Sequence, residues 1–115
     1  MVTLPGQHQT IMAGLNCGAT SPVAWPDLLA GLHACVAIED EWARQAMREL
    51  ASAGVVAGET GASGLAGLLA LLRAPGADAR REQLGLDSQA RVLVIVTEGA
   101  TDPVAYERIV KGGGQ

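Results

Sequence analysis

The clearest pattern along the chain is an amphipathic stripe that follows three consecutive carboxylates at residues 39–41. Apolar side chains recur there at spacings of three and four, which places them on one face of a helix. The carboxylates favour the first turn, because the helix dipole is positive at that end. Gly54 is a suitable residue for the helix to stop. The apolar stripe comprises Trp42, Ala43, Ala46, Met47 and Leu50.

Other stretches carry the start and stop signals of shorter helices. Pro26 and Pro103 suit a first helical position, and Asp102 is a suitable cap for the helix that Pro103 opens. Either Thr60 or Ser63 can cap another helix by accepting a hydrogen bond from its first turn. The expected helices cover residues 27–34, a stretch that ends at residue 73, residues 78–84 and residues 103–110.

Three short apolar runs, at residues 35–38, 55–57 and 91–96, alternate with these helices and are typical of strands. The last run is the clearest, because its apolar residues are consecutive and mostly β-branched, as expected for a strand buried on both faces. Alternating strands and helices predict an α/β fold. Three strands are few for an independent sheet. We therefore expect residues 1–115 to be a single segment of a larger domain.

Composition narrows the class of protein. Hydrophobic residues make up 49% of the chain, which argues against disorder throughout, and the absence of Phe predicts a core of Ala, Val, Leu and Ile. The net charge is -4 without any basic cluster, which argues against a nucleic-acid partner. No apolar run approaches the roughly 20 residues that span a bilayer, so no membrane partner is expected. Cys17 and Cys35 have no metal or redox spacing, and we expect buried, reduced thiols in a cytosolic protein.

Two polar residues stand where expected strands lead into glycine-rich turns. Glu59 lies between a strand and a glycine-rich helix start, where a carboxylate needs a partner, either the helix amides or a ligand. The glycine spacing does not match a dinucleotide fingerprint, and close packing on the sheet explains Gly64 and Gly67 more simply. Thr97 directly follows the clearest strand, where ligands bind in open α/β sheets. A threonine that caps its own turn is the alternative.

Three stretches, taken in order, resemble the C-terminal part of the fold-type II pyridoxal-phosphate enzymes, the tryptophan synthase β-subunit superfamily. Residues 10–15 (Thr-Ile-Met-Ala-Gly-Leu) and residues 22–25 are similar to segments of threonine dehydratases and threonine synthases. Residues 58–64 (Gly-Glu-Thr-Gly-Ala-Ser-Gly) are similar to the superfamily's Glu-Pro-Ser-Gly-Ala helix start, and residues 97–103 to the stretch that ends the cofactor site. Within the superfamily these stretches are most similar to those of the diaminopropionate ammonia-lyases.

The resemblance implies an open three-layer α/β sandwich, of which this chain forms a part, and pyridoxal 5′-phosphate as the cofactor. It implies that Thr97 hydrogen-bonds the pyridine nitrogen and that Glu59 and Gly61 lie beside the ring. It further implies a cytoplasmic enzyme that acts on a small amino acid and forms a homodimer when complete. The residues implied to lie near the substrate are Thr10, Met12, Ala13 and Gly14.

The single lysine, Lys111, follows the last motif and matches nothing catalytic in the superfamily, whose Schiff-base lysine and phosphate loop lie upstream of these motifs. We therefore predict a C-terminal fragment of an ammonia-lyase that is inactive alone. The complete enzyme is expected to perform α,β-elimination on a small amino acid such as 2,3-diaminopropionate, giving pyruvate and ammonia. Two alternatives stay open: a non-catalytic α/β interaction module or decayed paralogue, and a fragment of an enzyme like threonine synthase or dehydratase.

Overall fold

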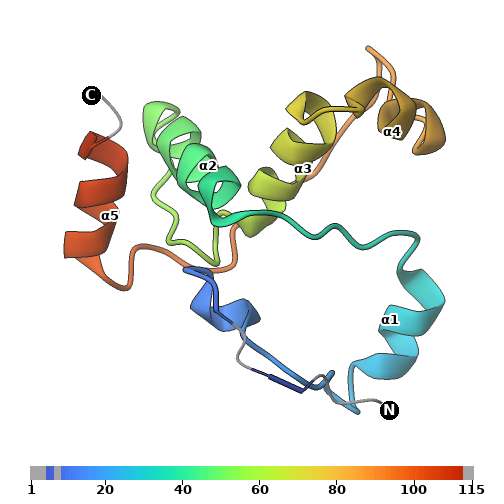
Figure 1. Cartoon of the computed structure of the whole chain (residues 1–115), viewed down its shortest axis with the longest axis horizontal. Helices are drawn as coiled ribbons and strands as arrows, with labels where there is room; N and C mark the ends of the chain where they lie inside the picture. The colour runs from blue at the N-terminus through green and yellow to red at the C-terminus, as the bar shows by residue number, and fades with distance from the viewer. Residues whose placement is uncertain (1–4, 7–8, 113–115) are drawn as a thin grey trace.

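The computed structural model describes residues 5–6 and 9–112, and within them the regular structure is helical. Figure 1 shows α2 (Asp40–Ser52) between α3 (Ser63–Arg73) and α5 (Pro103–Lys111), and both of these helices pack against it. α4 (Ala77–Gln83) packs against α3. The 3-10 helix η1 (Ala13–Leu15) precedes α1 (Trp25–Gly31), which stands apart from the cluster of the other α-helices.

The predicted amphipathic stripe forms the buried face of α2. Ala43, Ala46 and Met47 are buried, and Trp42 and Leu50 are partly buried against the same core. The carboxylates of the first turn and the apolar spacing therefore predicted both the helix and the face that packs.

The end of α2 is also where the sequence predicted it. Gly54 has a φ of 78°, a value that glycine adopts without strain. Its N–H donates to the carbonyl of Ala51 at 3.0 Å, and the N–H of Val55 donates to the carbonyl of Leu50 at 2.8 Å. These two bonds form the Schellman arrangement, which satisfies the last carbonyls of a helix.

The buried core consists mainly of alanines with Leu69 and two methionines, so the expected Ala and Leu are present but the expected Val and Ile are not. Among the described residues no Val or Ile is fully buried, and Ile11, Ile38 and Ile109 only pack against the core while partly buried, so the prediction is wrong for Val and Ile in the buried core. Alanines let α2 and α3 approach closely, and the flexible methionines fill the remaining gaps. The buried apolar side chains are Met12, Ala43, Ala46, Met47, Ala57, Ala62, Ala66, Leu69 and Ala70.

The three segments predicted as strands form no strand within the part of the chain that the structure describes. Residues 91–96 run alongside α3 (Figure 1), with Leu93 and Ile95 exposed by 86% and 69%. A strand exists through hydrogen bonds to neighbouring strands, and these segments have no such neighbour among the described residues. The expected α/β sandwich is therefore not confirmed.

The predicted helix caps are partly right. Asp102 caps α5, because its Oδ1 accepts hydrogen bonds from the N–H groups of Val104 and Ala105, both at 3.0 Å. α3 begins at Ser63 and has the predicted end, but no side chain caps it, so the cap predicted at Thr60 or Ser63 is wrong.

Cys17 and Cys35 are exposed free thiols, so the prediction that they are buried is wrong. They lie in the connections on either side of α1, which contributes no buried residue to the core. None of the helices in the described ranges combines the length and the apolar character needed to cross a membrane.

An ion pair between α2 and α3 makes stability depend on pH. Arg73 Nη1 lies 2.5 Å from Glu49 Oε1, and this hydrogen bond holds the pKa of the Glu49 carboxyl below its ordinary value of 4.5. A carboxyl whose pKa is lowered by folding stabilises the fold above its unfolded pKa, and that contribution is lost as the pH falls through the folded pKa. The pair is partly exposed, so the contribution is small.

We expect Arg73→Gln to be slightly less stable than the parent chain near neutral pH. The difference should shrink as the pH falls below 4.5, because the Glu49 carboxyl then becomes protonated in both chains. Urea unfolding at a series of pH values measures it. Arg91→Gln, at an exposed position, is the control, and a difference that stays constant with pH would contradict the assignment.

Candidate functional site

The three stretches that carry the sequence motifs meet in space. The N–H of Gly14 donates to Thr60 Oγ1 at 3.0 Å, which joins the first stretch to the second. The N–H of Gly58 donates to the carbonyl of Glu98 at 3.3 Å, which joins the second stretch to the third. Segments far apart in sequence thus form one junction, as expected for the parts of a single site.

The second and third stretches are in very close contact. A Cβ on Gly58 would stand 2.5 Å from the carbonyl oxygen of Gly99, and one on Gly61 would stand 2.1 Å from the carbonyl oxygen of Glu98. Both glycines are buried. The glycines are therefore required here because backbone packs directly on backbone.

Asp40 anchors the first stretch and was not among the residues that sequence reasoning selected. Its carboxylate accepts a hydrogen bond from Thr10 Oγ1 and one from the N–H of Ile11 at 3.2 Å. The sequence did carry a signal, since Asp40 is one of three carboxylates at the start of α2. The helix dipole accounts for carboxylates at this helix start, but one of them also binds a loop about thirty residues upstream.

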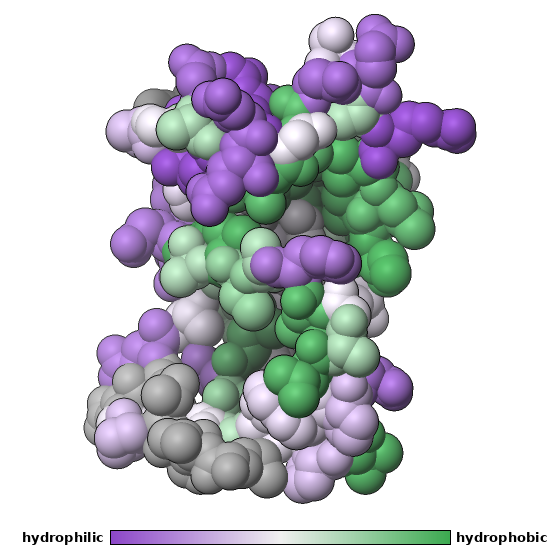
Figure 2. All heavy atoms as spheres, turned by 90° about the vertical axis from the view of Figure 1, so that its right-hand side faces the viewer, coloured by the Kyte–Doolittle hydropathy of each residue, from purple (hydrophilic) through white to green (hydrophobic). Residues whose placement is uncertain are grey.

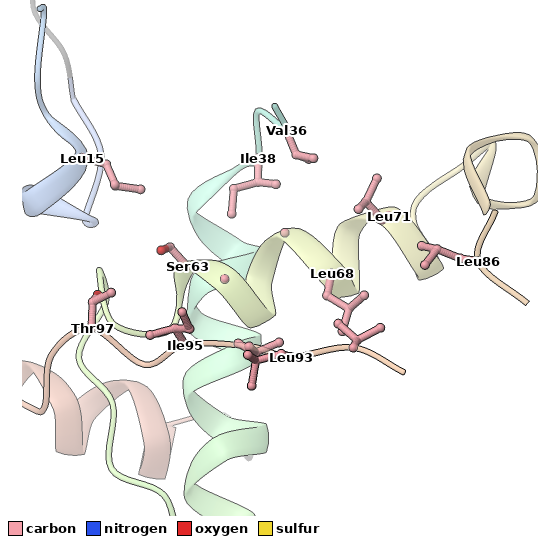
Figure 3. Close-up of a pocket in the computed structure, with 14 residues that line it drawn as sticks. Leu15, Val36, Ile38, Ser63, Leu68, Leu71, Leu86, Leu93, Ile95 and Thr97 are labelled. Carbon is pink, nitrogen blue, oxygen red and sulfur yellow. The ribbon is translucent and has the colours of Figure 1, made fainter. Parts of the chain in front are cut away.

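A groove with a volume of about 680 Å³ runs along α3. Its lining is mostly apolar, and Figure 3 shows Ser63 and Thr97 at the end of the groove where α3 begins. Thr97 is exposed, and its hydroxyl forms no hydrogen bond with the other described residues. The remaining lining residues are Leu15, Val36, Ile38, Gly64, Gly67, Leu68, Leu71, Leu86, Val92, Leu93, Val94 and Ile95.

Glu59 lines a different cavity from Thr97. This smaller cavity, of about 340 Å³, also contains Arg44, Arg48 and Arg108. Arg44 and Arg48 both pair with Glu41, at 3.3 and 2.6 Å, and the hydrogen bond from Arg48 lowers the pKa of the Glu41 carboxyl. The structure therefore does not bring Glu59 and Thr97 into one cavity.

The sequence of the chain can also be compared with those of known proteins. A family profile described as "Pyridoxal-phosphate dependent enzyme" matches residues 2–98. The chain belongs to this family. The match covers the first two of the three motif stretches and the start of the third, up to Glu98. Pyridoxal phosphate is accordingly its cofactor.

Two relatives of this chain are diaminopropionate ammonia-lyases. The enzyme of Escherichia coli strain K12 is 36% identical over 118 residues, which is 98% of this chain and 30% of the relative. The enzyme of Salmonella typhimurium is 35% identical over 114 residues, or 94% of this chain and 28% of the relative. The chain thus spans less than a third of the length of these curated relatives.

The residues predicted to lie near the substrate differ in how far they are buried in the structure. Thr10 is half-buried and donates to Asp40, and Met12 is buried in the core. Ala13 and Gly14 are exposed. Contact of any of these residues with a substrate stays a prediction, as does contact of Glu59 and Gly61 with the cofactor.

The role of Asp40 is testable. Asp40→Asn keeps the size of the side chain but loses one of two acceptor oxygens, so we expect it to lower the free energy of unfolding by about 1 to 3 kcal/mol. Urea unfolding measures this value. Glu39→Gln removes a neighbouring charge at the same helix end without touching the loop, because the Glu39 side chain caps nothing. An equal loss in both variants would mean that the dipole, and not the loop, explains Asp40.

Proposed function

We propose that this chain is the C-terminal segment of a pyridoxal-phosphate-dependent ammonia-lyase. The complete enzyme performs α,β-elimination on a small amino acid such as 2,3-diaminopropionate, giving pyruvate and ammonia. The observation that carries the proposal is the meeting of the three motif stretches at Gly14, Thr60, Gly58 and Glu98. The identity of 36% to a diaminopropionate ammonia-lyase over nearly the whole chain supports it.

The proposal gives Thr97 the most specific role. Its exposed hydroxyl stands at the polar end of an otherwise apolar groove, a setting that fits a flat aromatic ring with one hydrogen-bonding atom. When bound, the cofactor supplies an electron sink for the substrate's α-carbon. A neutral hydroxyl on the pyridine nitrogen does not hold that nitrogen protonated as a carboxylate does. The sink is then weaker, which suits rapid elimination.

The other residues serve as walls in this proposal. Glu59 and Gly61 lie beside the ring in the complete enzyme, although in this chain Glu59 lines a separate cavity from Thr97. Residues 10–14 border the substrate. Asp40 positions those residues, because its carboxylate holds both the Thr10 hydroxyl and the Ile11 amide. In the same proposal the complete protein is an α/β sandwich that functions as a cytoplasmic homodimer.

Lys111 is assigned a structural role. Its Nζ lies 2.9 Å from Glu107 Oε2 on the exposed face of α5, one turn away along the helix. The ammonium group near the C-terminal end of a helix also interacts favourably with the helix dipole. A different lysine, from the part of the relatives that this chain does not match, would therefore hold the cofactor.

Two proteins test the proposal: this chain alone, and this chain joined in frame to the unmatched part of the E. coli diaminopropionate ammonia-lyase. We expect the joined protein to bind the cofactor, measured by its absorbance, and to release pyruvate from 2,3-diaminopropionate. The chain alone should do neither. Lys111→Arg in the joined protein is the control and should keep full activity. A joined, folded protein without cofactor absorbance would overturn the proposal.

The alternatives give different results in the same assays. A fragment of an enzyme like threonine dehydratase would give a joined protein that turns over threonine instead, and a fragment of an enzyme like threonine synthase would give one that turns over phosphohomoserine. A non-catalytic interaction module would fold alone and bind a partner without cofactor.

A further inference from the structure

The cavity that Glu59 lines differs in character from the groove along α3. Figure 2 shows hydrophobic side chains gathered over the middle of one face of the molecule, and the α3 groove is lined mostly by such residues. The cavity of Glu59, of about 340 Å³, is instead lined by three of the eight lysines and arginines of the chain. Two of them, Arg44 and Arg48, belong to α2, and Arg108 belongs to α5, which packs against α2 (Figure 1). We call this space the arginine cavity.

The three arginines keep most of their hydrogen-bond donors available. Arg44 and Arg48 are both held by Glu41, at 3.3 and 2.6 Å. A guanidinium carries five N–H groups, so each of these side chains can still donate to a ligand. The side chain of Arg108 forms no hydrogen bond or ion pair with the other described residues. The arginine cavity therefore concentrates positive charge and N–H donors in a chain whose net charge is -4.

Glu59 contributes a carboxylate to the same cavity. This half-buried side chain forms no hydrogen bond or ion pair with the other described residues, the three arginines and the amides at the start of α3 included. A carboxylate withdrawn from water needs a partner, and an ammonium group supplies both donors and charge. Gly112, at the C-terminal end of α5, also lines the cavity, and the helix dipole favours a cation at that end.

The two unpaired charges and the apolar wall together restrict the ligand. Ile11 and Ile109 form the apolar part of the lining, and both are half-buried. An α-amino acid matches all three features, because its carboxylate can accept two N–H bonds from one guanidinium while its ammonium group donates to a carboxylate. Inorganic phosphate or a simple carboxylate would instead leave Glu59 unpaired beside a second negative charge.

We propose that the arginine cavity binds a small α-amino acid as a zwitterion, with its carboxylate on Arg108 and its ammonium group on Glu59. Arg44 and Arg48 add positive charge beside the bound carboxylate. The cavity does not contain Thr97, so this is a second site, separate from the one proposed for the cofactor. The proposed place of residues 58–61 beside the ring concerns the turn, whereas the carboxylate of Glu59 belongs to the arginine cavity.

The experiment titrates this chain with L-valine, without cofactor, and follows its backbone amide signals by NMR. L-valine carries both charges and a short apolar side chain. Its analogue 3-methylbutanoate lacks the ammonium group, and its analogue 2-methylpropylamine lacks the carboxylate. We expect L-valine to shift the signals of Ile11, Glu59 and Ile109 in a saturable way, with an affinity roughly tenfold or more above that of either analogue. Each analogue loses one charge-assisted contact.

Substitutions test the two proposed contacts separately. Arg108→Gln should weaken the binding of L-valine by roughly tenfold or more, and the chain stays folded because this exposed side chain holds no partner. Lys111→Gln is the matched control, since it removes the same charge from the same helix at a residue that does not line the cavity. Glu59→Gln should abolish the preference for L-valine over 3-methylbutanoate, because the site then lacks the partner of the ammonium group.

Three outcomes would overturn the inference. The first is a titration without saturable shifts. The second is binding of inorganic phosphate or 3-methylbutanoate as tight as that of L-valine, which would indicate a simple anion site. The third is equal weakening by Arg108→Gln and Lys111→Gln, which would assign the effect to the overall charge of α5. The titration requires neither cofactor nor turnover, so its result is independent of whether the joined protein is an active lyase.

Discussion

Gly61→Ala is expected to destabilise the chain by about 3 kcal/mol, near the upper end of the usual cost of overpacking. The new Cβ would stand 2.1 Å from the carbonyl oxygen of Glu98 and 3.0 Å from its N and carbonyl carbon. All three are backbone atoms, so no flexible side chain can move aside to relieve the contact. Separation of the two loops is the only relief, and it opens the junction at which the motif stretches meet.

Thermal and urea unfolding of the chain measure this loss, and Gly67→Ala is the matched control. Gly67 lies within α3, and nothing stands within 4 Å of the position that its Cβ would take. The prediction that close packing requires this glycine is therefore wrong. Alanine is there expected to stabilise the chain by about 0.5 to 1 kcal/mol, because it favours the helix. If Gly61→Ala unfolds at the same urea concentration as the parent chain, the close contact of the loops is wrong.

Thr97→Ala is expected to slow the elimination by roughly 5- to 150-fold in the joined protein, the equivalent of a hydrogen bond of about 1 to 3 kcal/mol. The reason is the loss of the one hydroxyl that the proposal places on the pyridine nitrogen. Thr97→Ser keeps the hydroxyl and should restore most of the rate. Thr97→Asp should also be slow, because a carboxylate holds the nitrogen protonated and changes the strength of the electron sink.

Steady-state kinetics with 2,3-diaminopropionate measure these rates, and the cofactor absorbance shows whether the ring environment has changed. Thr101→Ala is the control, since Thr101 is an exposed threonine on the same connection and does not line the groove. Equal rates for Thr97→Ala and Thr101→Ala would favour the alternative, in which Thr97 caps its own turn and does not bind the cofactor.

The candidate site could be predicted from the sequence only in part. The order of the motif stretches indicated that residues 10–14, 58–61 and 97–99 belong together, and the contacts of Gly14 with Thr60 and of Gly61 with Glu98 agree with that indication. The role of Asp40 was missed, because nothing near it in the sequence identifies the Thr10 hydroxyl as its partner. The separate cavity of Glu59 was missed because it depends on how α5 packs against α2.

Local patterns in the sequence were enough to predict α2 and the start of α5. Apolar spacing set the buried face of α2, Gly54 set its end, and Asp102 with Pro103 set the start of α5. These features depend on residues within one or two turns of each other, so a local pattern is enough to specify them.

Which segments meet and which stay unpaired depends on contacts between distant parts of the folded chain. A strand needs a neighbour that lies elsewhere in the chain or in another polypeptide, and residues 91–96 have the composition of a strand without such a neighbour among the described residues. The close contact at Gly61 likewise depends on a backbone carbonyl that lies far along the sequence. Pairing and packing over long distances are properties of the folded chain, and no short stretch of sequence encodes them alone.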